Sequence, residues 1–293
     1  MAGELVEWGV DDLNVSGGEP LLRRDLMKLL KVFYDLDMDL SLNTNGILLN
    51  RGRAMELSRL ECFVFLSMDG ASRETHERLR GPGTWSRVLR AAKTLRSAGV
   101  PFAVVFAMNS KNFHEAGDIP RLAERVGALY VATIPIIPSG AARLPNGLAL
   151  SPAQVFKGLK MFEESVEELG YFGSIWCAPF AKAFLKSRHV HVSGCSEGMD
   201  ISPSGDILLC DTLDFTVSNV LRDGVRGAWR KLVESSLYRQ AFLTRMPEEC
   251  RDCPAFSRCR GGCVARAYLT HRTFQAADPL CPLLSRGGAA AEA

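Results

Sequence analysis

Residues 250–263 read CRDCPAFSRCRGGC, which places four cysteines at the spacing C-x2-C-x5-C-x3-C. Cys195, Cys210 and Cys281 extend this series, so that seven of the nine cysteines lie in the last third of the chain. Thiolates at such short intervals are typical of ligands gathered for metal centres. Glycines at positions 205, 261 and 262 allow the backbone of these loops to approach a bulky ligand closely.

Three kinds of site compete for these cysteines. A disulfide framework suits small secreted domains, whereas this chain has 293 residues, an odd number of cysteines and no recognisable signal peptide. Zinc would use two closely spaced pairs to close one tetrahedron, and would leave Cys195, Cys210 and Cys281 unexplained. Iron–sulfur clusters draw four cysteines from runs of this kind, often with one ligand from far along the chain. Seven cysteines come close to two such clusters, so we favour iron–sulfur over the other two.

Composition limits the classes of partner. The chain is 47% hydrophobic and carries 35 basic and 33 acidic side chains, a net charge of +2. This balance gives no reason to expect nucleic acid or an anionic membrane as a partner. The longest apolar runs, 62–66 and 130–137, are far shorter than the ~18 residues of a membrane span. Free thiols together with iron–sulfur chemistry predict a cytoplasmic protein.

Between residues 13 and 138, short apolar runs alternate with amphipathic helices. Residues 26–33 carry apolar side chains at i, i+3, i+4 and i+7, which predicts a helix, whereas 63–66 is a continuous apolar run typical of a strand covered on both faces. Five such strands separated by helices predict an α/β fold with a parallel sheet. The polar turns after these strands are expected to converge at the carboxyl edge of the sheet.

The order of these turns carries a resemblance. G-G-E-P at 17–20 is followed by T-N-G at 44–46, S-x-D-G at 67–70 and H-x3-R-G at 76–81, an order that resembles radical S-adenosylmethionine (SAM) enzymes. The cysteine series resembles the SPASM domain, a C-terminal extension with two auxiliary [4Fe–4S] clusters. Together they imply an α/β fold in which an N-terminally truncated partial (β/α)6 radical SAM barrel is followed by a small cysteine-rich SPASM domain.

The resemblance also implies which cysteines share a cluster. The second auxiliary cluster would be held by Cys250, Cys253, Cys259 and Cys281. The first would be held by Cys195, Cys210 and Cys263, and is one thiolate short. Its fourth ligand stays open between Cys177, His189, His191, a group of the substrate and solvent.

The SAM contacts implied by the resemblance come from three turns. Gly17, Gly18 and Glu19 would bind the aminoacyl end of SAM, because a carboxylate and exposed peptide carbonyls are proper acceptors for its ammonium group. Ser67 lies where the family places a hydroxyl near the ribose, and Asn43 where polar contacts to SAM occur. The backbone of residues 134–138 would lie near the adenine.

Two further motifs are less defined. Asp211 directly follows Cys210, where sulfatase-maturing members of the family carry an aspartate that acts as general base. The other interpretation is a loop carboxylate bonded to backbone N–H groups. His76, Arg80 and Gly81 recur in members that modify peptides, but the sequence assigns them no role.

The sequence departs from the family's pattern before Gly17. Radical SAM chemistry needs a C-x3-C-x2-C loop that binds a third, SAM-binding [4Fe–4S] cluster, and residues 1–16 hold no such motif. We interpret the chain as a truncated form of a complete enzyme that has this cluster. A shortened protein that keeps its auxiliary clusters without the radical step is the alternative.

Four regions are expected along the chain. Residues 1–150 would form the partial barrel without its first strand and cluster loop, and 151–190 a linking region opened by a helix with a capping box at Ser151 and Gln154. Residues 191–286 would form the SPASM domain, and 287–293 a disordered tail.

The function that the resemblance implies is stated for the parent enzyme. This radical SAM oxidoreductase or maturase would generate a 5′-deoxyadenosyl radical to modify a ribosomally made peptide or protein, with auxiliary clusters that bind substrate or take up an electron. Its partners would be that substrate, SAM and an electron donor such as ferredoxin or flavodoxin. Tetrapyrrole modification, as in haem synthesis, is the alternative enzyme activity. A non-catalytic iron–sulfur carrier or scaffold, or a zinc-binding interaction module, is the alternative outside enzymes.

Overall fold

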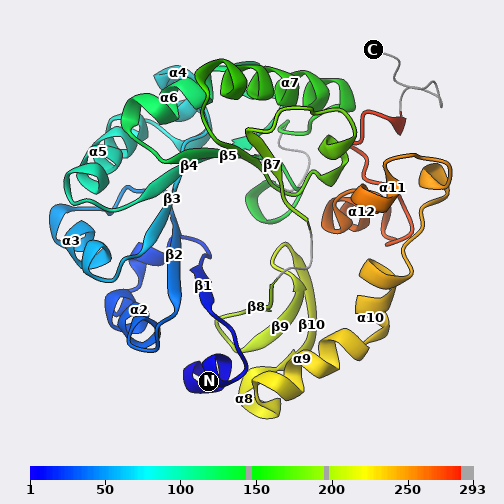
Figure 1. The fold of residues 1–293 in the computed structure, drawn as a ribbon, viewed down its shortest axis with the longest axis horizontal. Coiled ribbons are helices and arrows are strands. Elements are labelled where there is room, and N and C mark those ends of the chain that lie inside the picture. Colours follow the sequence, from blue (N-terminus) through cyan, green and yellow to red (C-terminus); the bar gives the residue numbers. More distant parts are fainter. Residues whose placement is uncertain (143–146, 195–197, 285–293) are drawn as a thin grey trace.

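A computed structural model of the chain describes residues 1–142, 147–194 and 198–284. Cys195 and the tail expected at 287–293 therefore lie outside the described residues. Within them, seven parallel strands stand side by side in sequence order and curve into half a barrel, with helices on the outer face (Figure 1). This architecture confirms the predicted α/β fold.

The half-barrel alternates strands with helices along the chain. Its strands are β1 (Asp12–Val15), β2 (Asp39–Thr44), β3 (Phe63–Ser67), β4 (Phe102–Met108), β5 (Tyr130–Pro135), β6 (Gly173–Ile175) and β7 (Val190–Val192). Its α-helices are α1 (Ala2–Glu7), α2 (Leu26–Tyr34), α3 (Arg51–Arg59), α4 (Arg73–Arg80), α5 (Thr84–Ser97), α6 (Asp118–Val126) and α7 (Pro152–Leu169). Short 3-10 turns are η1 (Pro20–Leu22), η2 (Phe113–Glu115), η3 (Gly140–Ala142) and η4 (Pro179–Ala183).

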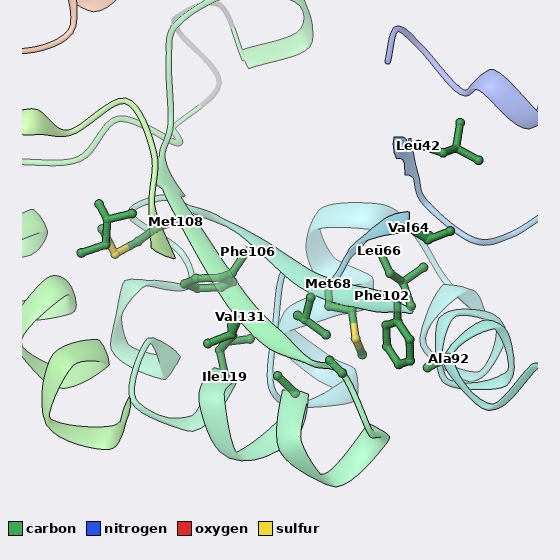
Figure 2. Close-up of a cluster of buried hydrophobic side chains, with 14 of the residues drawn as sticks. Leu42, Val64, Leu66, Met68, Ala92, Phe102, Phe106, Met108, Ile119 and Val131 are labelled. Carbon is green, nitrogen blue, oxygen red and sulfur yellow. The ribbon is translucent and has the colours of Figure 1, made fainter. Parts of the chain in front are cut away.

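The main core lies between the sheet and the outer helices. Val64 and Leu66 of β3 are fully buried on the helix side of the sheet. The residues that alternate with them along the strand are half-buried on the concave side. Figure 2 shows this layer, in which side chains of neighbouring strands pack toward Ala92 of α5 and Ile119 of α6. Burying one Leu or Phe side chain contributes roughly 1.5–3 kcal/mol. The core therefore fixes the strands and the positions of the turns that follow them.

The helix predicted from the capping box is confirmed as α7. Ser151 accepts a hydrogen bond from the Gln154 backbone, the Gln154 side chain accepts one from the Ser151 backbone, and Gly170 ends the helix in the left-handed conformation. β6 and β7 follow α7 and join the same parallel sheet, so the sheet continues into the stretch expected to be a linker. The five strands predicted between residues 13 and 138 correspond to β1–β5. β6 and β7 were not predicted, because three-residue strands leave no recognisable apolar run in a sequence.

The chain from residue 198 onward forms a smaller region around a second hydrophobic core. Three strands pair antiparallel in the order β10-β9-β8, and short helices cover them. The strands are β8 (Asp200–Ile201), β9 (Asp206–Cys210) and β10 (Leu213–Asn219). The helices are α8 (Val220–Asp223), α9 (Val225–Glu234), α10 (Ser236–Tyr238), η5 (Arg239–Leu243), η6 (Glu248–Cys250), α11 (Phe256–Cys259) and α12 (Val264–His271).

This second region lies across the open side of the half-barrel and meets its first helix (Figure 1). Glu4 of α1 accepts a 2.8 Å hydrogen bond from the backbone N–H of Val225, which begins α9. The Trp8 and Trp229 rings pack edge to face at 6.1 Å. Contacts between α1 and α9 thus hold the two regions together. None of the described helices is long and apolar enough to cross a lipid bilayer.

Candidate functional site

Glu19 joins the first two turns at the carboxyl edge of the sheet. Its carboxylate accepts hydrogen bonds from the Leu21 backbone at 3.1 Å, from the Thr44 hydroxyl at 2.6 Å and from the Asn45 backbone at 2.8 Å. The sequence predicted this carboxylate as an acceptor for the SAM ammonium group. A carboxylate offers about four lone-pair positions, so the three protein donors leave room for one more.

Gly17 and Gly18 leave open space beside Glu19. Both are exposed, and a Cβ added at either position would meet no atom within 4 Å. Gly17 has φ +137°, a conformation that residues with a side chain rarely adopt. Within the described part of the chain, the backbone of neither glycine takes part in a hydrogen bond. The turn therefore presents free backbone groups that a polar ligand could reach.

The two other predicted SAM contacts lie on the concave side of the sheet. Asn43 is half-buried on β2, and its amide donates a 2.7 Å hydrogen bond to Asn14 of β1. Asn14 in turn donates to the Ser41 hydroxyl at 2.7 Å. Ser67 ends β3 and is half-buried. Asn43 and Ser67 remain predicted SAM contacts, placed on adjacent strands of the concave face.

The S-x-D-G and H-x3-R-G motifs form one structural cluster. The Asp69 carboxylate, 8% exposed, accepts from Arg80 at 2.5 Å and from the Ala107 backbone at 3.0 Å, which ties the ends of β3 and β4 together. The Asp69 backbone N–H donates to the buried His76 ring at 3.3 Å. A Cβ on Gly70 would lie 2.5 Å from the His76 backbone nitrogen. These contacts give His76 and Arg80 a structural role that the sequence did not reveal.

Aromatic side chains line part of the concave face. Phe63 and Phe65 of β3 pack against Tyr130 of β5, with Phe63 and Tyr130 stacked at 5.6 Å. Trp176, directly after β6, meets Phe65 edge to face at 5.3 Å. All four are half-buried, so each keeps part of its ring exposed. The wall is suited to flat or apolar groups of a ligand.

Four of the predicted cluster ligands form what we call the second cysteine group, Cys250, Cys253, Cys259 and Cys281. Burial, with smaller contributions from the neighbouring Cys281 and Cys253, raises the pKa of Cys250 to about 11. Burial likewise raises the pKa of Cys259 to about 12, with smaller effects from Cys281 and Cys250. The four thiols therefore lie within electrostatic reach of one another.

A buried arginine organises the loop that carries the second cysteine group. Arg245 is 7% exposed and donates five hydrogen bonds of 2.8–2.9 Å to backbone carbonyls. The acceptors are Phe274, Arg260, Gly262, Gly261 and Ala276. All five N–H groups of the guanidinium are used, so Arg245 fixes the backbone between two cysteine-bearing stretches.

Three other cysteines form the first cysteine group, Cys177, Cys210 and Cys263. The Cys177 thiol donates a hydrogen bond to the Cys263 sulfur, which lowers the pKa of Cys263 below its ordinary value. Burial raises the pKa of Cys210 to about 12, and the nearby Cys263 charge contributes to the rise. All three pack in the second core. Cys195, predicted for this cluster, lies outside the described residues.

Asp278 and Arg266 form a buried ion pair beside the first cysteine group. Their side chains are 0% and 2% exposed and meet at 2.6 Å. Asp278 also accepts from the Cys263 backbone at 2.8 Å, and Arg266 donates to the carbonyls of Pro135, Ile136 and Cys177. The pair thus connects α12 to the ends of β5 and β6. The end of β5 belongs to residues 134–138, which were predicted to lie near the adenine.

Asp211 occupies the turn between β9 and β10 and is exposed. Its backbone N–H donates to Asp200 at 3.0 Å, and the Cys210 thiol donates to its carboxylate at 3.5 Å. No described backbone N–H donates to the Asp211 carboxylate, so the alternative of a loop carboxylate bonded to backbone N–H groups is not what the structure shows. A general-base role for Asp211 remains a prediction.

The donor chemistry fits iron–sulfur clusters at both groups. Among the described residues, no three His, Cys, Asp or Glu side chains converge on one point where a single metal ion could bind. The four thiolates of a [4Fe–4S] cluster each bind a different iron and need not meet at one point. Free thiols that are buried or half-buried, near loops held by buried arginines, are compatible with that requirement.

Known proteins resemble the chain in both sequence and fold. Residues 1–123 match the family model described as Radical SAM superfamily. An AdoMet-dependent heme synthase of Nitratidesulfovibrio vulgaris is 28% identical over 91% of this chain and 77% of its own length. A PqqA peptide cyclase of Bradyrhizobium diazoefficiens is 28% identical over 96% and 75%. The solved structure of native anSMEcpe with bound AdoMet has a similar fold, with a TM-score of 0.75, 21% identity, and coverage of 96% of this chain and 82% of that one.

Residues 1–123 are therefore similar to the radical SAM superfamily, as the order of their polar turns had indicated. The distant relatives in sequence include AdoMet-dependent heme synthases, a mycofactocin maturase and a PqqA peptide cyclase. SAM and iron–sulfur clusters are typical of such enzymes, in agreement with the cofactors predicted from the sequence.

The sequence missed three functional side chains, Arg245, Arg266 and Asp278. Each lies three to five residues from a predicted cluster ligand, so a search for charged residues next to the cysteines would have found them. Their partners lie as far as 131 residues away along the chain. Nothing local in the sequence identifies those partners.

Proposed function

We propose that the chain carries the SAM-binding turns and the auxiliary-cluster cysteines of a radical SAM enzyme with a SPASM domain, which modifies a ribosomally made peptide or protein. The observation that supports this proposal is that Cys250, Cys253, Cys259 and Cys281 influence one another's pKa, and that Cys210 and Cys263 form a separate neighbouring pair. The Glu19 network at the carboxyl edge of the sheet supports a SAM site there.

In this proposal each group of side chains has a defined task. Gly17 and Gly18 offer free backbone groups to the aminoacyl end of SAM, and Glu19 both orders the turn and keeps one acceptor position for the ammonium. The two cysteine groups would hold [4Fe–4S] clusters, which supply one-electron redox chemistry when bound. Asp211 would accept a proton from the substrate, since its carboxylate is exposed beside Cys210.

Two observations concern the substrate. The name of the PqqA peptide cyclase supports a peptide, and the half-buried polar side chains of Ser41 and Asn43 on β2 could contact one. The name of the heme synthase, with equal identity, supports a tetrapyrrole, which could stack on the aromatic wall of Phe63, Phe65, Tyr130 and Trp176. We place the peptide first and keep tetrapyrrole modification as the second candidate. An electron donor such as ferredoxin or flavodoxin and a cytoplasmic location belong to the same proposal.

The test is a binding experiment on the anaerobically reconstituted protein. Saturable SAM binding in equilibrium dialysis, weakened by Glu19→Gln, is expected. Ligand binding at the concave face is then followed by tryptophan fluorescence, with Trp176→Phe as the control. The probes are the peptide encoded by a short reading frame beside this gene, and an iron porphyrin with propionate side chains. No saturable SAM binding would refute the proposal, and binding of the porphyrin instead of the peptide would replace it with the second candidate.

A further inference from the structure

We propose that the free edge of β7 binds an extended, acidic segment of the peptide substrate as an additional strand. Lys182 and Arg258 line the cavity at this edge and would hold an aspartate or glutamate side chain of that segment. The proposal rests on the proposed function, because it takes the bound peptide to be the substrate. It places this segment away from the Glu19 turn, which follows β1 at the opposite edge of the same sheet.

The first step is the free edge itself. β7 is the last strand of the sheet, so one of its edges has no neighbouring strand among the described residues (Figure 1). The bonds to β6 use the backbones of His189 and Ser193, and Val190 and Val192 alternate with these residues, so their backbone groups point away from β6. Within the described part of the chain, the Val190 carbonyl and both backbone groups of Val192 take part in no hydrogen bond. Such a row of unpaired groups is a template for another strand.

The second step is a cavity of about 400 Å³ along this edge. Residues 190–192 of β7 line it, together with Leu185 beyond η4 and Arg258 of α11. η4 contacts both β7 and α11, so the cavity lies where the barrel sheet meets the second region. Its volume falls within the range of about 300–1,000 Å³ that is usual for ligand sites. A side chain of an added strand can therefore enter it.

The third step is the charge of the cavity. Lys182 is half-buried and Arg258 is exposed, and neither side chain has an ion pair or hydrogen bond to a described residue. No acidic side chain is among the described residues that line the cavity. Ser187 also lines it, but its hydroxyl already donates to Glu167 and accepts from the His189 backbone. The two unpaired cations therefore favour an anionic group.

The free backbone groups and the two cations together favour a peptide over a small anion. A free phosphate or carboxylate would use Lys182 and Arg258 but would leave the edge of β7 unpaired. An added strand satisfies both, because its main chain bonds to the edge while alternate side chains fill the adjoining pocket. Alternate side chains of a strand point to the same face, so an acidic residue at every second position presents one acidic face to the cations.

The charge arm of the test measures fluorescence anisotropy of labelled peptides with the anaerobically reconstituted full chain. One peptide alternates glutamate with valine, and a second has glutamine in place of each glutamate. We expect the second to bind about tenfold more weakly. Lys182→Gln and Arg258→Gln should each weaken binding of the acidic peptide by about three- to fivefold. The controls are Lys93→Gln, exposed on α5, and Arg251→Gln, exposed and next to a cysteine of the second cysteine group as Arg258 is, and both should bind like wild type.

The backbone arm changes only the peptide, so it does not depend on the folding of any variant. Two further versions of the acidic peptide carry N-methyl groups on alternate amides, in opposite phase. Only one edge of an added strand faces β7, so one version should lose binding and the other should bind like the parent peptide. Inorganic phosphate is added as a competitor to measure the contribution of the cations alone.

Equal affinity of the two methylated peptides would overturn the proposal, as would equal affinity of the glutamate and glutamine peptides. Self-association of Lys182→Gln/Arg258→Gln with unchanged peptide affinity would also overturn it, because the two cations would then only keep the edge from pairing with a second copy. SAM binding is measured on the same samples by equilibrium dialysis. The expected peptide binding without SAM binding would count against the proposed function alone, and SAM binding without the expected peptide binding against the β7 site alone.

Discussion

Replacing Arg266 with methionine should strongly destabilise the protein even without any cofactor. Arg266 is 2% exposed and pairs with Asp278, which is completely buried. Methionine has a similar length and an apolar end, so it fills the space but leaves the Asp278 charge without its partner. Removing one member of a buried ion pair costs about 3–5 kcal/mol.

The other hydrogen bonds of Arg266 and Asp278 determine where in this range the loss of unfolding free energy falls. Asp278 keeps hydrogen bonds from the Cys263 and Leu280 backbones, which favours the lower end. The carbonyls of Pro135, Ile136 and Cys177 lose their donors, which favours the upper end. An unsatisfied buried polar group costs about 1–3 kcal/mol. We therefore expect about 4 kcal/mol, near the middle of the range.

The assay is urea unfolding of chelator-treated protein followed by circular dichroism. Arg90→Met is the control, because Arg90 is exposed on α5 and its side chain has no partner among the described residues. It should stay within about 0.5 kcal/mol of wild type. In the double variant Arg266→Met/Asp278→Asn the buried charge is gone, so part of the lost stability should return. A loss below about 1 kcal/mol in Arg266→Met would refute the reasoning that the pair is a buried, coupled unit.

Three further changes test other parts of the structure. Glu19→Gln should lower the free energy of unfolding by about 1–3 kcal/mol, because an amide cannot accept from all three donors of the carboxylate. The control is Glu4→Gln at the α1–α9 contact, which measures the cost of the same substitution elsewhere in the protein. Gly70→Ala should lower the free energy of unfolding by about 1–3 kcal/mol or more, since its Cβ would lie 2.5 Å from the His76 backbone nitrogen. Gly3→Ala, whose Cβ would meet no atom within 4 Å, should not lower it in the same urea titration. Burial raises the pKa of Glu115, but hydrogen bonds from Thr75, Ser72 and Ala71 outweigh it and lower the pKa below its ordinary 4.5. A lowered pKa adds stability that is lost as the pH falls, so wild type should lose stability below about pH 4.5 more steeply than Glu115→Gln, and parallel profiles would contradict this.

The alternation of strands and helices could be predicted because it is written in local periodicity. The runs at β3 and β4 are apolar and continuous, and the stripes of α2 and α5 recur at helical spacing. The same method could not find β6 and β7. Each has only three residues, which form a strand because they pair with neighbouring strands and not because of an apolar pattern of their own.

Which residues interact across the site was predictable only in part. The division of the cysteines between two clusters followed from the family's pattern and stays a prediction, because Cys195 lies outside the described residues. The ion pair of Asp69 with Arg80, and the contacts of Arg266 with β5, depend on long side chains that reach distant backbone. For that reason the sequence assigned Arg80 no role.

The most direct test of the account is a metal analysis of the anaerobically reconstituted wild-type chain. Two [4Fe–4S] clusters predict about eight iron and eight acid-labile sulfide per chain, and a brown protein. A colourless protein with about one zinc per chain and no sulfide would contradict the central claim that the two cysteine groups hold iron–sulfur clusters.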